Sequence, residues 1–298
     1  MTKSALPYAA FTGCALIWGS TFLVIRVGND SLAPIWACSL RLVLAAAILN
    51  LILLTTRQKW PKGAALRAAA WYGFWEFGVS LPLLYWGERV VASGLAAVFY
   101  AICPVMAMLQ AKALGMEDLS LRRLSAAMIA FGGVVVIFWR ELLHGGSPLG
   151  LLAIFVAACA APTAGLVLQR GPRQGAAGAN GVGALVGFAV CMVVSFSLGE
   201  THPMPRTAGQ FLPIAYLAIA GSTGAFVLFA WLLQRWKTTT VAFLGVIVPV
   251  IAVGLGALFR KESFAPGSLV GAIVVLVGVT IALRTPGSLN DSDAPVEA

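Results

Sequence analysis

Two charged side chains lie deep inside long apolar stretches, where a charge is costly and usually faces a partner or a water-filled cavity. Glu76 stands between Trp75 and Phe77 near the middle of its stretch, and Arg41 lies about 10–12 Å from the end of another at 1.5 Å per residue. Glu76 could bind a substrate ammonium group or a coupling proton, or could make only a structural hydrogen bond. Because the two residues have comparable depth, they could also form a structural ion pair; otherwise Arg41 is free to bind a substrate carboxylate.

Aromatic and polar side chains recur on the helical face that carries Glu76, with Tyr72, Ser80 and Leu83 spaced three or four residues apart. The predicted substrate-lining residues, from this face and from other apolar stretches, are Trp18, Tyr72, Glu76, Ser80, Tyr85, Tyr100, Gln110, Phe226 and Trp231. An aromatic slot with a few polar tips suits a flat, zwitterionic molecule. The alternative is that such aromatic residues anchor helix ends at the membrane interface, which is the role expected for Trp60, Trp71 and Trp139.

Signals for an enzyme are absent from the sequence. Both histidines, His144 and His202, fall in predicted outer loops, so neither is expected to ligate a metal. The five cysteines all lie in apolar stretches and show no metal-binding or disulfide spacing. No phosphate-binding loop of the Walker type occurs, so ATP is not expected to bind this chain. We therefore expect no catalytic residue, no metal and no cofactor.

The composition requires lipid as the solvent. Of 298 residues, 60% are hydrophobic and only 10% are charged, with a mean hydropathy of +0.91. A soluble domain carries about 25% charged residues, so this chain cannot cover a water-facing surface. The net charge of +9 does not indicate nucleic acid, because the Lys and Arg residues lie at the ends of apolar stretches. The expected partners are the lipid bilayer and a small-molecule substrate.

Ten membrane-spanning helices are predicted, at residues 7–27, 34–55, 67–87, 92–113, 121–139, 149–169, 179–198, 209–232, 239–259 and 266–284. Pro82 and Pro213 are expected to interrupt two of them, and the polar tail at 285–298 to be disordered. With a cytoplasmic N-terminus, about 13 Lys and Arg residues fall on the inner side and about 6 on the outer. Both termini are therefore predicted to be cytoplasmic.

The chain contains an internal repeat, in which the numbers of matching residues differ by 145. The matches without a gap include Trp86 with Trp231, Pro104 with Pro249, Glu117 with Glu262, and Gly133 with Gly278. Each half holds an odd number of predicted spans, so two inverted repeats are expected, at 1–144 and 145–284, as in secondary transporters. Pro104 and Pro249 would bend their helices beside the cavity and act as hinges, unless they are static packing kinks.

Several motifs resemble those of a known family. The run from Leu16 to Phe22, the triplet Leu40-Arg41-Leu42 and the stretch from Tyr85 to Val136 resemble EamA-type members of the drug/metabolite transporter superfamily. The resemblance implies ten helices in two inverted five-helix repeats around a central cavity, lined by spans 1, 3, 4, 6, 8 and 9. Members often carry Trp early in the sixth span, where this chain reads Ala161-Pro162-Thr163; the cavity floor is therefore expected to differ.

The expected function is a secondary inner-membrane carrier that exports small metabolites by alternating access. Bacterial exporters of amino acids and their analogues are the most similar group, and the aromatic side chains favour aromatic or neutral amino acids. The alternatives are export of nucleosides or drugs, and a passive channel or regulatory membrane protein on the same scaffold. The Gly183/Gly187 and Gly267/Gly271 pairs are typical of close helix packing within one chain, so a monomer is expected.

Overall fold

The computed structural model describes residues 5–144, 146–260 and 266–284. Within these ranges all regular structure is helical. Six described segments are long and apolar enough to cross a membrane: Leu6–Asn29, Pro34–Thr55, Ser93–Ala113, Pro148–Arg170, Ala176–Ser197 and Ala208–Leu233. The tail at 285–298 and Glu262, the repeat partner of Glu117, lie outside the described residues.

The helices follow the predicted spans within a few residues at their ends. Those before residue 145 are α1 (Leu6–Asn29), α2 (Pro34–Thr55), α3 (Gly63–Gly73), η1 (Phe74–Ser80), α4 (Leu81–Gly87), α5 (Ser93–Tyr100), α6 (Cys103–Ala113), α7 (Leu121–Ile137) and α8 (Trp139–His144). Those after it are α9 (Pro148–Arg170), α10 (Ala176–Ser197), α11 (Ala208–Tyr216), η2 (Leu217–Ala225), α12 (Phe226–Leu233), α13 (Thr238–Val241), α14 (Leu244–Arg260) and α15 (Pro266–Leu283).

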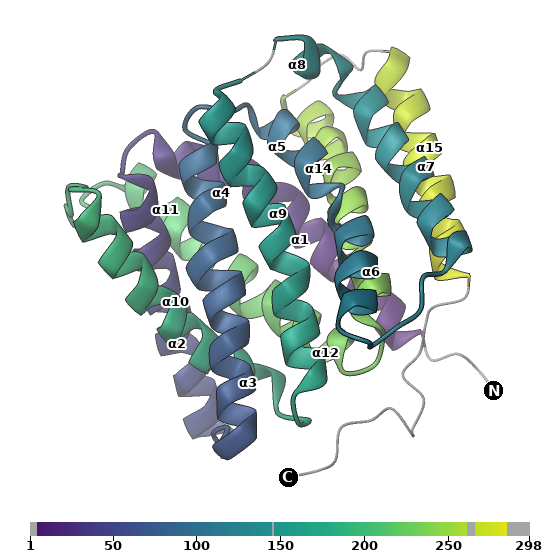
Figure 1. The fold of residues 1–298 in the computed structure, drawn as a ribbon. Coiled ribbons are helices and arrows are strands. Elements are labelled where there is room, and N and C mark those ends of the chain that lie inside the picture. Colours follow the sequence, from purple (N-terminus) through teal and green to yellow (C-terminus); the bar gives the residue numbers. More distant parts are fainter. Residues whose placement is uncertain (1–4, 145, 261–265, 285–298) are drawn as a thin grey trace.

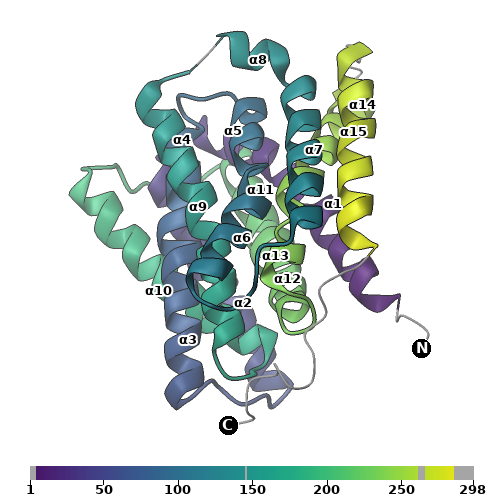
Figure 2. The ribbon, with the colours of Figure 1, turned by 45° about the vertical axis from the view of Figure 1, so that its right-hand side comes forward.

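Two tightly packed flanks enclose a less regular centre. Helices α7 and α15 form one flank, and α2, α3 and α10 form the opposite one (Figures 1 and 2). Between them lie α1, α9, α12 and the broken pairs α5–α6 and α13–α14 (Figure 1). The irregular elements are therefore surrounded by protein, as backbone with missing helical hydrogen bonds must be in a membrane.

The interruptions of the third and eighth spans are π-helical rather than proline breaks. In η1 the backbone N–H of Leu81 bonds the carbonyl of Glu76, five residues earlier. The second such stretch, η2, ends at Ala225, which is the repeat counterpart of Ser80 at the end of η1. Pro82 follows in the first turn of α4, where its missing N–H costs little. Single-turn π-helices of this kind occur often at functional sites.

The two repeated prolines have different surroundings, which corrects the expectation of equivalent mid-helix kinks. Pro104 lies in the first turn of a new helix, α6, after a break at residues 101–102. Pro249 lies inside α14, and the break in its span comes earlier, at residues 242–243. The mid-helix placement is thus right for Pro249 and wrong for Pro104. Their role as hinges stays a prediction.

Small residues bring helix backbones into direct contact on both flanks. A Cβ atom on Gly133 of α7 would lie 2.7 Å from the carbonyl oxygen of Gly271 on α15, and one on Gly278 would lie 2.7 Å from that of Ala126. In the repeat register Gly271 corresponds to Ala126 and Gly278 to Gly133. Helices α7 and α15 therefore make the same contact twice: once a glycine of α7 faces a carbonyl of α15, and once a glycine of α15 faces a carbonyl of α7. On the other flank, Gly183 of α10 packs on Gly73. Gly267, by contrast, is exposed.

Gly133→Ala should destabilise the protein, because the new methyl group meets backbone that cannot move aside. We expect a loss of about 1–3 kcal/mol of unfolding free energy, as for other overpacked sites. The control is Gly132→Ala: that position is exposed, a Cβ meets nothing within 4 Å, and alanine favours the helix by up to about 1 kcal/mol. Thermal unfolding in detergent measures both variants. Equal melting temperatures for the two would contradict the close α7–α15 packing.

Candidate functional site

An interior cavity of about 110 Å³ lies among the central helices. One water needs roughly 10–15 Å³ by the same measure, so the space holds several waters or part of a small solute. It is lined by residues of α1, η1, α4, α5, α6, α9, α12, α13 and α14, and by Arg41 of α2. These are the spans that the resemblance implied, with Arg41 as an addition from the second span.

Five of the predicted substrate-lining residues reach the cavity and four do not. Those lining it are Trp18, Glu76, Ser80, Tyr100 and Phe226. Those outside it are Tyr72, Tyr85, Gln110 and Trp231. Whether the first group contacts a substrate stays a prediction.

All four residues outside the cavity have partners within the protein, and that of Tyr85 is Arg41. The Tyr72 hydroxyl is buried and donates to Asn180 Oδ1 at 3.0 Å. Gln110 donates to the carbonyl of Cys159 at 2.9 Å. Trp231 carries the Arg235 guanidinium 3.7 Å above its ring, at the end of α12.

Arg41 is almost completely buried, with 1% of its surface exposed. Its Nε donates to the Ser222 hydroxyl at 2.7 Å, and Nη1 lies 3.4 Å from the Tyr85 hydroxyl. A Cβ atom on Gly221 would lie 3.0 Å from Nη2, so the missing side chain there makes room for the guanidinium. Arg41 is thus held by neutral groups, which accept two hydrogen bonds from it without neutralising its charge.

The predicted Arg41–Glu76 ion pair is wrong. Within the described part of the chain, the ion pair closer than 4 Å joins Arg123 to Glu117. Glu76 is 7% exposed and its Oε2 is buried without a hydrogen-bond partner among the described residues. The guanidinium instead bonds Ser222 on η2 and Tyr85 on α4, so the two opposite charges lie on the wall of one cavity without an ion pair.

Aromatic rings form much of the remaining wall. Trp18 of α1 packs edge-on against Phe226 at 5.0 Å and lies 5.3 Å from Phe229, both on α12. Phe22, one turn further along α1, packs edge-on against Tyr100 at 5.8 Å. The cavity therefore combines an apolar, aromatic surface with two ionisable side chains of opposite type that form no ion pair within 4 Å.

The departure from the family pattern at Ala161-Pro162-Thr163 shapes the cavity floor. Pro162 stands inside α9 and, with Ala161, lines the cavity. Proline cannot bond the carbonyl four residues earlier, that of Ala158, and the Cys103 thiol donates to that carbonyl at 3.3 Å. The preceding carbonyl, of Ala157, accepts from Ser80. Side chains from the third and fourth spans thus replace the lost helical bonding.

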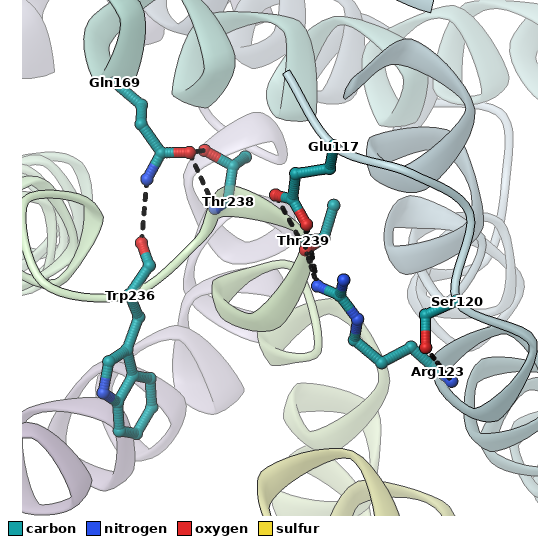
Figure 3. Close-up of polar contacts among 7 residues, drawn as sticks. All are labelled: Glu117, Ser120, Arg123, Gln169, Trp236, Thr238 and Thr239. Atoms are coloured by element: carbon teal, nitrogen blue, oxygen red, sulfur yellow. Dashed lines mark hydrogen bonds and ion pairs between the residues drawn. The ribbon is translucent and has the colours of Figure 1, made fainter. Parts of the chain in front are cut away.

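A group of polar side chains closes the end of the cavity beside Thr238. Glu117 accepts from Arg123 Nη1 at 2.8 Å and from the Thr239 hydroxyl at 3.0 Å, and that hydroxyl accepts from Arg123 at 2.6 Å (Figure 3). Gln169 of α9 accepts from both the N–H and the hydroxyl of Thr238 (Figure 3). This Glu117 cluster (Glu117, Arg123, Gln169, Thr238 and Thr239) joins three segments that are far apart in the sequence.

Sequence reasoning missed the threonines of this cluster and Ser222. Thr238 to Thr240 form a polar run at the start of the ninth predicted span, and Ser222 stands in the polar triplet from Gly221 to Thr223. Polar runs inside an apolar stretch were therefore the available signal. Their partners lie 122 and 181 residues away, which no local pattern reveals.

Family comparison gives matches along nearly the whole chain. The EamA-like transporter family matches residues 6–139 and again 148–284. A solved crystal structure superposes with a TM-score of 0.75 over 95% of this chain and 98% of that one, at 16% identity. That likeness shows a common fold.

Three relatives illustrate the range of named proteins. The "uncharacterized inner membrane transporter YedA" of Escherichia coli K12 is 27% identical over 282 residues, covering 92% of both chains. The "probable amino-acid metabolite efflux pump" of the same strain is 26% identical, covering 89% of this chain and 91% of its own. The "probable terminal-alkyne amino-acid exporter" of Streptantibioticus cattleyicolor is 26% identical, covering 93% and 94%.

Thr239→Val should weaken the Glu117 cluster, because Glu117 and Arg123 each lose a hydrogen-bond partner. We expect a loss of about 1–2 kcal/mol of unfolding free energy. The control is Thr280→Val on α15, whose exposed hydroxyl bonds only the Leu276 carbonyl of its own helix and should change stability by less than about 0.5 kcal/mol. Thermal unfolding of Glu117→Gln alone and of the Thr239→Val/Glu117→Gln double variant completes a double-mutant cycle. Strict additivity of the two changes would contradict the three-way contact.

Proposed function

The chain belongs to the EamA-like transporter family, and we propose that it exports small zwitterionic metabolites, foremost aromatic or neutral amino acids. The observation that carries the proposal is the pair of separated charges on one cavity wall. Arg41 is matched to a carboxylate, since its partners in the protein are neutral hydroxyls. Glu76, with an unpartnered oxygen among the described residues and a place in the cavity lining, is matched to an ammonium group.

The aromatic wall supports a preference for flat side chains. Trp18, Phe226 and Phe229 present ring edges and faces, with Trp18 at 5.0 Å and 5.3 Å from the other two rings, and such rings stack favourably on a further aromatic group. Two relatives are named for the efflux of amino-acid metabolites or of an amino acid. An α-amino acid with an aromatic side chain uses all three features of the cavity at once.

Alternating access between inverted halves, residues 1–144 and 145–284, is the proposed mechanism. The reciprocal contacts of α7 and α15 are those expected of a pseudo-two-fold axis. Tyr100 and Gly245, which are counterparts in the repeat, also meet: a Cβ on Gly245 would lie 2.6 Å from the Tyr100 carbonyl oxygen. In the proposed cycle the Glu117 cluster opens on the inner side, and the breaks before Pro104 and Pro249 absorb the bending.

Counterflow in liposomes tests the transport activity. Vesicles containing purified protein and preloaded with unlabelled phenylalanine should transiently accumulate labelled phenylalanine, because a carrier exchanges substrate faster than it transports it net. Nucleosides and a cationic drug serve as comparison solutes. A channel gives no such overshoot, and an overshoot confined to nucleosides or drugs would move the substrate to another chemical class.

Substrate analogues test the two charges separately. Arg41→Gln should weaken transport of phenylalanine about 10- to 100-fold, the equivalent of about 1.5–3 kcal/mol for a charged hydrogen bond, but spare phenethylamine, which has no carboxylate. Glu76→Gln should spare 3-phenylpropionate, which has no ammonium group. Competition for labelled phenylalanine gives each apparent affinity. If both variants lose both analogues equally, the charges do not bind the substrate's ends.

Single cysteines test the proposed topology, in which both termini are cytoplasmic. In Figure 1 the α2–α3, α6–α7 and α9–α10 connections lie at one end of the molecule and α8 at the other. On a background without the native cysteines, Thr201→Cys should react with an impermeant thiol reagent added to whole cells, and Lys59→Cys should not. Both positions are exposed. The opposite labelling pattern would invert the orientation and contradict the proposal.

A further inference from the structure

Glu88 is a buried carboxyl group without a hydrogen-bond partner among the described residues. It follows the last residue of α4 and is 3% exposed, and both Oε1 and Oε2 are unpartnered there. Glu200 shows the usual alternative for a covered carboxylate: it accepts from the backbone N–H groups of Ile35 and Trp36 and from the Ser195 hydroxyl. An ionised carboxylate placed as Glu88 is would be strongly unfavourable, which a bound proton relieves.

The surroundings of Glu88 leave it without a neutralising contact in the described part of the chain. Arg26 on α1 acts electrostatically on Glu88, and Glu88 in turn acts on Tyr85 of α4 and Tyr100 of α5. Arg26, which is itself described, forms no ion pair with it within 4 Å. On the α9 side the neighbouring residue, Gly87, packs on the Ile154 side chain and on the Gly150 carbonyl.

A second orphan oxygen lies one turn away. Asn29 donates through Nδ2 to the carbonyl of Tyr85 at 2.9 Å, while its Oδ1 is buried without a partner among the described residues. A carboxylate cannot donate to this oxygen, whereas a protonated carboxyl carries one O–H donor. The unpartnered atoms named here are all hydrogen-bond acceptors, so a proton on Glu88 would supply the missing donor.

Glu88 continues the row of cavity residues on the third span. Glu76, Ser80, Leu84 and Glu88 follow one another at intervals of four, and the first three line the cavity. Twelve residues correspond to about 18 Å along a helix. Ser80 shares a hydrogen bond of 3.1 Å with Tyr100, and both carboxyl groups act electrostatically on that tyrosine. A hydroxyl pair thus lies between the two acids.

We propose that Glu88 is a proton-binding site at the end of the cavity opposite the Glu117 cluster. This inference rests on the proposed transport function: the proton that Glu88 binds enters the cell as the substrate leaves. The carboxylate takes up one proton when its end of the cavity is open to the outside. It releases that proton inward during the return, so that the carboxyl group regains its starting charge and one positive charge enters the cell in each cycle.

The direction of the shift in the pKa of Glu88 also supports its assignment as a proton-binding group. Burial raises the pKa of Glu88 well above its ordinary value, and the positive charge of Arg26 lowers it by less. A pKa raised in the folded state means that the folded protein binds the proton more tightly than the unfolded chain. The resulting stabilisation is present at low pH and is lost as the pH rises through the raised folded-state pKa.

Thermal unfolding in detergent from pH 5.5 to 9 tests the site without any transport assay. The melting temperature of the wild type should fall as pH rises, and Glu88→Gln, which mimics the protonated form, should fall less and exceed the wild type at high pH. The control Glu200→Gln should lower the melting temperature and leave its pH dependence in place. An identical pH profile for Glu88→Gln and wild type would overturn the proposal. So would stabilisation by sodium, relative to choline, that Glu88→Gln abolishes, because the site would then bind a metal cation.

Transport by the same variants separates coupling from binding. Glu88→Gln should keep phenylalanine counterflow but lose accumulation driven by a proton gradient, and Glu200→Gln should retain both in proportion to the folded protein. Gradient-driven accumulation by Glu88→Gln at the wild-type level would overturn the coupling role. Absence of counterflow in the wild type would refute the proposed function instead, and the unfolding profiles would still decide whether Glu88 binds a proton.

Discussion

A hydrocarbon solvent supplies no hydrogen bonds, so every carbonyl or N–H released from a helix must find a partner inside the protein. This constraint separates the molecule into two kinds of packing. On the flanks the helices are regular and approach through small residues, as Gly133 and Gly271 do. In the centre lie η1 and the breaks in the fourth and ninth spans, and these irregular segments border the cavity. Irregular backbone is thus tolerated around the cavity.

The same constraint explains why the two arginines near the cavity differ. Arg123, at the edge of the membrane region, has a carboxylate partner at 2.8 Å. Arg41 is buried more deeply, and its hydrogen-bond partners are neutral hydroxyls. Removing a charge from water without an opposite charge is a net cost to stability, and conflicts of this kind persist mainly where function needs them. This cost is the physical reason why we propose that Arg41 and Glu76 bind a ligand that carries both missing charges.

Particular residues show what could and could not be predicted from the sequence. The length of the apolar stretches predicted the helices, because a helix that spans lipid can be recognised without knowing which helices it packs against. On the face of Glu76, Ser80 reaches the cavity wall as expected, whereas the Tyr72 hydroxyl bonds Asn180, 108 residues away in the sequence. The Arg41–Glu76 pair was wrong because Ser222, 181 residues from Arg41, provides the nearer partner. Glu88 was overlooked as a span-end residue, although the packing of α1 and α9 around α4 buries it.

The chemistry of the cavity is less symmetric than its scaffold. In the register of the repeat, Glu76 corresponds to Gly221, Arg41 to Val186 and Trp18 to Thr163. The first half therefore supplies both charges, and the second half supplies the space that Arg41 occupies beside Gly221. In the proposed cycle, related halves would exchange their shapes as the two ends open in turn, because each would adopt the other's packing. A single set of charges would meanwhile keep a zwitterion in one orientation throughout, so under this proposal the scaffold would govern access and the unmatched residues would govern selection.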